Sequence, residues 1–205
     1  MKQIFILLSL IVSSTALAQI SRTDSMLVDI VDSLETPVLL PEKMIFTQRL
    51  IWGEHGLIRN WRPLTKENRQ QEFKIRRVMA TTHQITGLLT LAGFVAQGIV
   101  GAKLYTNYSD ELRATHRNIA SGINLSYSIT TALVLTCPPA IVHRRGFSSA
   151  KAHRILSVVH LLGMITTNIL ANQVKNNFEL KPYHRAAALT TFGAYAVSII
   201  AFRLK

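Results

Sequence analysis

The stretch VMATTHQITGLLTLAGFVAQGIVGA, residues 78–102, carries no Asp, Glu, Lys or Arg. A predominantly apolar run of about 20 residues is long enough to cross the hydrocarbon core of a bilayer as an α-helix. Three more apolar runs of similar length follow it in the chain, at residues 118–142, 155–174 and 186–202. The sequence therefore predicts an all-α fold with four transmembrane helices.

The segments between these runs carry turn residues and charges. They read YTNYSDELR (105–113), CPPAIVHRRGFSSAK (137–151) and KNNFELKPY (175–183). Short connections of this kind join antiparallel neighbours. The apolar runs are also rich in Gly, Ala, Ser and Thr, which allow helices to pack closely in lipid. Residues 74–205 are thus expected to form an antiparallel four-helix transmembrane bundle.

The composition supports the membrane class. The chain of 205 residues combines 48% hydrophobic residues with a formal net charge of +12. A soluble domain of that charge is normally more polar. Nucleic-acid binding needs basic residues clustered on a folded surface, whereas most Lys and Arg here flank the apolar runs, as they do beside membrane helices. We therefore expect the lipid bilayer, and no nucleic acid, as a partner.

The N-terminus, MKQIFILLSLIVSSTALAQ, has the pattern of a secretory signal peptide. Lys2 precedes a short apolar core, and Ala16 and Ala18 form a small-residue cleavage site. The alternative, an uncleaved first membrane helix, would need a longer apolar core. We expect residues 1–18 to be removed.

The signal peptide also bears on location. It predicts an integral protein of a bacterial inner membrane, with the segment that follows it in the periplasm. The first span then enters from the outer face. The positive-inside rule prefers the opposite orientation, because that outer face would carry more Lys and Arg than the inner one.

Residues 19–73 are expected to form a short helical extramembrane segment. TDSMLVDIVDSLE (23–35) has the apolar spacing of an amphipathic helix, which Pro37 and Pro41 end. MIFTQRLIWGEHGLIRNWRPLT (44–65) then interleaves Trp and Arg with apolar residues. This mixture is typical of a segment in the headgroup layer. It also fits a subdomain that caps the bundle, and the sequence leaves both interpretations open.

Each apolar run begins at or near a histidine. These residues are His83, His116, His153 and His184, and the last three are followed by Arg117, Arg154 and Arg185. Ionisable side chains at membrane depth are costly and point to function. In an antiparallel bundle His116 would face His184 near one surface. His83 would face His153 or His160 near the other.

Two imidazoles held on rigid helices are what bis-histidine ligation of a haem iron requires. An Arg beside each ligand could pair with the anionic propionates. The HR motif favours His153, whereas depth favours His160, which lies two turns further along the same run; we lean slightly to His153. The alternatives are a non-redox membrane protein that binds or transports a metal ion, and a structural assembly module. Two ligands at each face are too few for an ordinary metal-ion site.

The four-helix histidine pattern over residues 76–203, with HQITGLLTLAGFVAQGIVG (83–101) and AHRILSVVHLLGM (152–164), resembles the haem-binding core of the cytochrome b561 family. The resemblance implies two b-type haems and transmembrane electron-transfer oxidoreductase activity. It also implies a donor such as a quinol or an ascorbate-like reductant and an acceptor that the sequence does not identify. A homodimer is compatible with this plan. The chain departs from the family in its Trp-rich outer segment and in lacking the helices that flank the core in many members.

Overall fold

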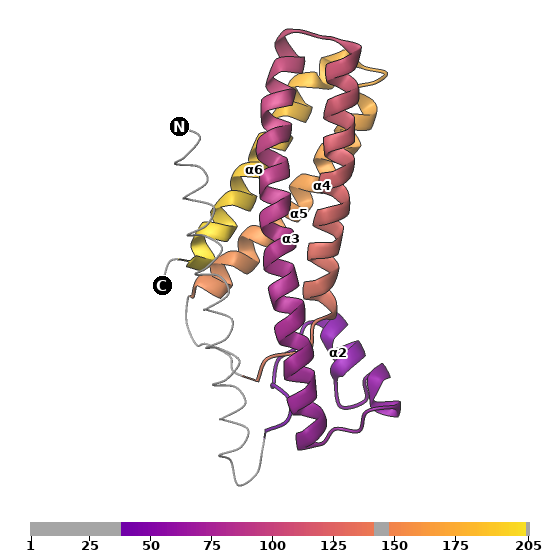
Figure 1. Ribbon diagram of the computed structural model, residues 1–205, viewed down its shortest axis with the longest axis vertical. Helices are drawn as coiled ribbons and strands as arrows, with labels where there is room; N and C mark the ends of the chain where they lie inside the picture. Colours follow the sequence, from indigo (N-terminus) through magenta and orange to yellow (C-terminus); the bar gives the residue numbers. More distant parts are fainter. Residues whose placement is uncertain (1–37, 142–147, 204–205) are drawn as a thin grey trace. The chain divides into compact units, whose positions relative to one another are not determined.

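The computed structural model describes residues 38–141 and 148–203 (Figure 1). Within these ranges every regular element is a helix, so the all-α prediction is confirmed for them. The signal peptide and the amphipathic helix predicted at 23–35 lie outside the described residues.

Two short and four long helical elements make up most of the described chain, with one further 3-10 turn. In chain order they are α2 (Phe46–Trp52), the 3-10 helix η1 (Leu57–Asn60), α3 (Lys66–Thr106), α4 (Asp110–Thr136), α5 (Ser149–Gln173), the 3-10 helix η2 (Phe178–Leu180) and α6 (Lys181–Arg203). The charged lead-in to the first apolar run contains neither Gly nor Pro. It therefore continues into that run without a break, and α3 is a single long helix.

Three of these helices, α3, α4 and α5, are long and apolar enough to cross a membrane. Over its described residues α6 is not among them, so the fourth span and the four-helix bundle stay predictions. The span predicted at 118–142 was wrong at its end, because α4 stops at Thr136. Pro138 and Pro139 follow, and the proline ring disfavours helical backbone in the residue before it and removes a backbone donor.

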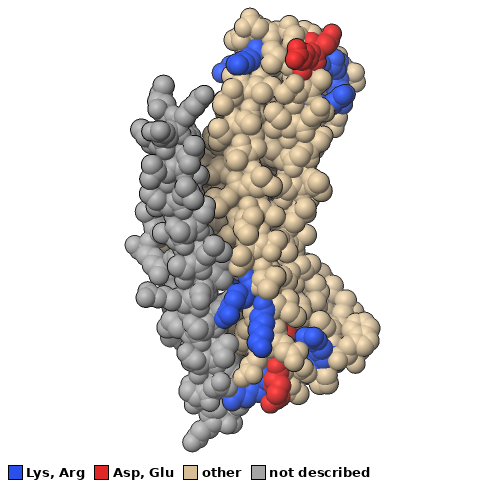
Figure 2. All heavy atoms as spheres, in the orientation of Figure 1, with Lys and Arg blue, Asp and Glu red and all other residues tan. Residues whose placement is uncertain are grey.

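Charged side chains avoid the middle of the long helices. On the face drawn in Figure 2, the charges over α3 gather toward its two ends. The sequence agrees, since α3 has no Asp, Glu, Lys or Arg between Arg77 and Lys103. Large apolar side chains such as Val95, Leu125 and Ile165 are exposed along these stretches. An apolar surface of this extent is typical of helices that face lipid.

The chain divides into two compact units. Unit 1 has the described residues 38–89 and 124–141, and unit 2 has 90–123 and 148–203. In unit 1 the first half of α3 runs beside the second half of α4 (Figure 1). Ser126 Oγ donates to the Thr86 carbonyl at 3.1 Å, and Thr130 Oγ1 donates to Thr86 Oγ1 at 2.7 Å. Small hydroxyl side chains thus join the two helices, as expected for packing in lipid.

Residues 38–65, which we call the cap, pack against the N-terminal part of α3 and the C-terminal end of α4. Trp52 is 6% exposed, and its Nε1 donates to the carbonyl of Thr136, the last residue of α4, at 2.7 Å. Arg59 Nη1 donates to Glu72 Oε1 of α3 at 2.5 Å. The structure therefore shows the Trp- and Arg-rich segment packed on the helices as a cap, and its place in the headgroup layer stays a prediction.

Arginines of the charged lead-in bind the loop after α4. Arg76 Nη1 donates to the Pro138 carbonyl at 2.6 Å, and Arg69 Nη2 donates to the Pro139 carbonyl at 3.1 Å. Arg69 also pairs with Glu72, and both side chains are fully buried. Carbonyls just beyond a helix end need external donors, so the early stop of α4 is stabilised from α3.

In unit 2, α5 and α6 pack closely along their lengths. Gly163 of α5 lies so near Thr191 of α6 that a Cβ at Gly163 would collide with the Thr191 hydroxyl. Phe94 of α3 contacts Tyr195 of α6 with ring centres 5.2 Å apart. The close contact requires glycine at position 163, which is the use of small residues predicted from the sequence.

Candidate functional site

The rings of His116 and His184 lie together in unit 2. His116 is in the second turn of α4 and His184 is in the first turn of α6, and their ring centres are 6.4 Å apart at an interplanar angle of 76°. This is the pairing predicted from the antiparallel pattern. Both side chains are of intermediate exposure.

The separation of these two rings fits ligation of one iron from opposite sides. Metal–imidazole bonds are about 2 Å long, so two imidazoles that share a metal have ring centres roughly 6 Å apart. In addition, His116 Nδ1 is buried and has no hydrogen-bond partner. A buried polar atom without a partner is costly and calls for an explanation, which a bound group would supply. On these two observations the residues present fit a haem iron.

Three of the predicted ligands share one orientation. The Nδ1 atoms of His83, His153 and His184 lie 3.0, 3.0 and 3.1 Å from the main-chain carbonyl oxygens of Thr130, Ser198 and Thr167. Each bond joins two different helices. A carbonyl oxygen can only accept, so in each case Nδ1 carries the proton, and in the neutral ring Nε2 carries the lone pair. Metal-ligating histidines are held in this way, with one ring N–H donated to a fixed acceptor.

His116 is held differently, by a side chain of α3. Its Nε2 is 3.1 Å from Gln97 Nε2, and Gln97 Oε1 is buried without a partner. If the two ends of the Gln97 amide exchange places, its oxygen accepts from the Nε2–H of His116, and Nδ1 then has the free lone pair. Only with this exchange does a ring nitrogen of His116 have a lone pair for a metal, because otherwise Nε2 accepts from Gln97 and Nδ1 carries the proton.

Gly101 gives the His116 ring its space. A Cβ at Gly101 would lie 3.1 Å from His116 Cε1, whereas a Cβ at Gly98, on the same helix, would meet nothing within 4 Å. Gln97 and Gly101 are four residues apart and therefore share a face of α3. Gln97 and Gly101 were not among the residues predicted from the sequence. The pattern that could have indicated them is an amide and a glycine four residues apart inside a charge-free run.

Of the three arginines predicted to meet propionates, Arg185 has a defined position. Its guanidinium carbon lies 4.6 Å from the centre of the Tyr105 ring, and Lys181 Nζ lies 4.3 Å from the same centre. Lys181 also donates to the Tyr105 carbonyl at 3.1 Å. Two cations are thus held beside His184. Arg117, Arg154 and Arg185 are all exposed, and their predicted role at the propionates stays a prediction.

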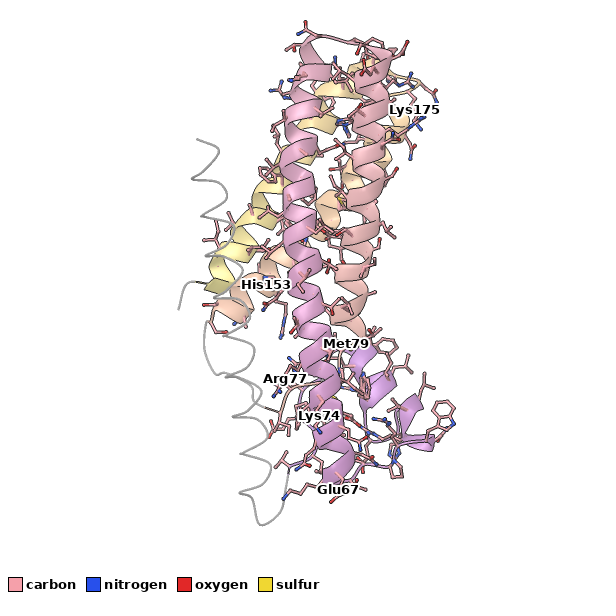
Figure 3. The ribbon with its side chains drawn as sticks, viewed as in Figure 1. Glu67, Lys74, Arg77, Met79, His153 and Lys175 are labelled. Carbon is pink, nitrogen blue, oxygen red and sulfur yellow. The ribbon has the colours of Figure 1, made fainter. Side chains whose placement is uncertain are left out.

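The members of the second predicted ligand pair belong to different units, so no contact within a unit tests their pairing. His83 belongs to unit 1, and His153 and His160 belong to unit 2. Figure 3 labels His153 near the start of α5. His160 is 8% exposed, and its ring meets Tyr195 edge-on with centres 4.9 Å apart. The pairing of His83 with either histidine remains a prediction.

Two further histidines do not belong to the predicted ligand set. His55 is exposed in the cap, and His143 lies outside the described residues. In the part of the chain that the structure describes, no three His, Cys, Asp or Glu side chains gather in a way that could hold a metal ion. Comparison of the chain with protein-family models, curated proteins and solved structures gave no match.

Proposed function

We propose that this protein is a membrane b-type cytochrome that carries electrons across or within the bilayer through two bis-histidine haems. The observation that carries the proposal is the shared orientation of three histidines. Each donates Nδ1–H to a main-chain carbonyl of another helix, which fixes the ring and puts the lone pair on Nε2, as a metal ligand needs. Histidines that only join helices also make such bonds, but here the same geometry recurs at three of the predicted ligands.

The first haem site is formed by His116 and His184. Their two rings would bind the haem iron, and the haem would supply one-electron redox chemistry. The Thr167 carbonyl fixes the tautomer of His184, and Gln97 orients the ring of His116. Gly101 leaves room beside His116. Arg185, held against Tyr105, is placed to pair with a propionate carboxylate.

The second site uses His83 together with His153. His153 shares the carbonyl-bonded orientation of His83 and His184, and the HR motif at 153–154 favours it slightly over His160 as the ligand. His160 would then contact the same haem from one side or lie on the path between the haems. Arg154, next to His153, and Arg117, next to His116, would meet the remaining propionates.

The rest of the proposal follows the resemblance to the cytochrome b561 family. It comprises a four-span bundle that includes α6, a cleaved signal peptide, and a bacterial inner membrane with the cap in the periplasm. A quinol or an ascorbate-like reductant would donate electrons to an acceptor still to be identified. The activity would be that of a transmembrane electron-transfer oxidoreductase, in a monomer or a homodimer.

The competing functions have less support. A metal-ion carrier needs more than two ligands at a site, and the described residues contain no such group. In a structural assembly module the three histidine–carbonyl bonds would only join helices, and this function predicts that haem is not bound.

The test is the absorption spectrum of the purified full chain in detergent, oxidised and then reduced with dithionite. Cells supplied with a haem precursor should yield coloured protein with a sharp α band on reduction and two haems per chain. His116→Ala and His184→Ala should each lose about half of the haem, because each removes one ligand of a two-ligand site. His55→Ala, at an exposed histidine of the cap, should keep both haems. Colourless protein from haem-replete cells, or full haem content in both ligand variants, would refute the proposal.

A further inference from the structure

The cap leaves its largest apolar side chains uncovered. Trp61 is 79% exposed, Phe46 is 78% exposed and Leu57 is 60% exposed, whereas Trp52 of the same segment is buried. Removing apolar surface from water is worth about 25 cal/mol for each Å². Uncovered side chains of this size on one small segment therefore indicate a surface that something apolar covers.

The cap meets α3 where its apolar run begins and α4 where its helix ends. His83 lies level with Thr130, as their hydrogen bond shows, and the two helices are antiparallel. Moving six residues outward on each helix makes Arg77 level with Thr136, and Thr136 accepts the hydrogen bond of Trp52. Figure 3 agrees, since α2 lies beside α3 near the labelled Arg77 and Met79. The charge-free run of α3 starts at the next residue, Val78. The end of α2 therefore lies at the edge of the apolar layer.

The second helix of the cap lies slightly further out. Arg59 of η1 pairs with Glu72, which precedes Val78 by six residues, or about 9 Å along a helix. The headgroup layer on each side of a bilayer is about 5–8 Å thick. Both α2 and η1 thus fall at the depth of the headgroups or at their outer edge.

The chemistry of the exposed face matches that layer. Phe46 and Leu50 are one turn apart on α2, and Arg49, which lies between them in sequence, is exposed. An open hollow of about 560 Å³ lies on this side of α2, and its lining residues include the apolar Met44 and Leu50, the cation Arg49, and the carboxylates Glu42 and Glu54. Aromatic side chains with adjacent arginines are the composition of a membrane–water interface.

We propose that the cap is a membrane-surface anchor whose exposed face lies in the phospholipid headgroup layer of the bilayer that α3 and α4 cross. Phe46 and Leu50 enter the layer from α2, and Trp61 enters at its outer edge. Arg49 pairs with lipid phosphate. Because the cap is fastened to α3 and α4 by Trp52 and Arg59, this contact sets the depth and tilt of those helices. The anchor needs no haem, so it stands or falls separately from the proposed electron transfer.

Tryptophan fluorescence of the full chain in lipid nanodiscs tests the anchor. The nanodiscs contain phosphatidylcholine and phosphatidylglycerol, with or without a lipid that carries a nitroxide quencher on its headgroup or deep on its acyl chain. The chain has only two tryptophans, so Trp61→Phe reports Trp52 alone, and the difference from the unsubstituted chain is the emission of Trp61. Both samples have the same haem content, which cancels in the ratio with and without quencher.

The anchor predicts that the headgroup quencher removes most of the Trp61 emission and that the deep quencher removes much less. A second probe, Phe46→Trp in the Trp61→Phe background, should respond in the same way. Trp61 emission that neither lipid quencher reduces, and that iodide quenches as strongly in nanodiscs as in detergent, would overturn the proposal. Such a result would mean that the face points into water and waits for a protein partner. Stronger quenching by the deep label than by the headgroup label would overturn it as well.

Discussion

Two buried polar groups, the Glu72 carboxylate of unit 1 and His116 Nδ1 of unit 2, differ in whether the chain supplies their hydrogen-bond partners. In unit 1 both oxygens of the Glu72 carboxylate accept hydrogen bonds from the guanidinium groups of Arg59 and Arg69. In unit 2 His116 Nδ1 and Gln97 Oε1 are buried and accept or donate none. The Glu72 carboxylate thus has its partners within the chain and fastens the cap, although Arg69 Nε is buried without one. The arrangement at His116 leaves imidazole nitrogen available beside another imidazole, which is what a ligand from outside the chain requires.

The comparison implies different kinds of failure on mutation. Removing a member of the Glu72 cluster leaves charge buried without its counter-charge, so folding should suffer. Changing the surroundings of His116 removes space or orientation at a site that the fold itself does not use. In that case haem binding should suffer while the helices persist.

The largest effect is expected from Glu72→Ala. This change leaves Arg59 and Arg69 without their carboxylate in a buried position, which costs about 3–5 kcal/mol of folding free energy. Thermal unfolding of the detergent-solubilised protein, followed by circular dichroism, should show a markedly lower midpoint. Glu54→Ala is the matched control, because Glu54 is an exposed carboxylate of the same cap, and it should leave the midpoint almost unchanged. Equal midpoints for the two variants would show that the cluster does not fasten the cap.

Local sequence patterns predicted some of these features, whereas contacts between distant residues could not be predicted. The charge-free runs and the histidines at their starts are local patterns, and they predicted three of the spans and the approach of His116 to His184. The Pro138–Pro139 pair was equally visible, yet the predicted span ran through it, because apolar residues on both sides made the run look continuous. The partner of Glu72 across the turn at Pro63 follows no periodicity, so it could not be predicted.

The orientation of the histidine rings could not be predicted either, because it depends on how the helices are aligned. Whether Nδ1 of His83 reaches the Thr130 carbonyl depends on the register between α3 and α4, which differs by a few ångströms among helix pairs of the same composition. Gln97 and Gly101 are likewise ordinary residues of an apolar helix until the register places them against His116. The ligand type could be predicted from the sequence, whereas the groups that orient the ligands could not.

A smaller effect is expected from Gly101→Ala. The added methyl group would press on His116 Cε1 at 3.1 Å. Crowding of a packed site costs about 1–3 kcal/mol, and here we expect the cost to appear as weaker haem binding at the His116 and His184 site. Haem titration of the apoprotein, with the reduced α band as the readout, measures it. Gly98→Ala should bind haem as the unsubstituted chain does, because a Cβ there meets nothing within 4 Å. Identical affinities for the two variants would mean that Gly101 does not shape the site.

The smallest effect is expected from Gln97→Leu. This variant tests most directly whether the surroundings of His116 serve haem binding or folding. The change removes the amide beside His116 Nε2 while keeping an apolar side chain of similar size in the helix. A single hydrogen bond is worth about 1 kcal/mol net, so haem should still bind, somewhat less tightly. The reduction potential of one haem should shift as well, because the ring of His116 loses its orienting partner. Potentiometric titration of the α band resolves this shift, and the potential of the haem at His83 should stay constant. If Gln97→Leu instead lowered the unfolding midpoint as Glu72→Ala does, the amide would belong to the scaffold, and the contrast between the two units would disappear.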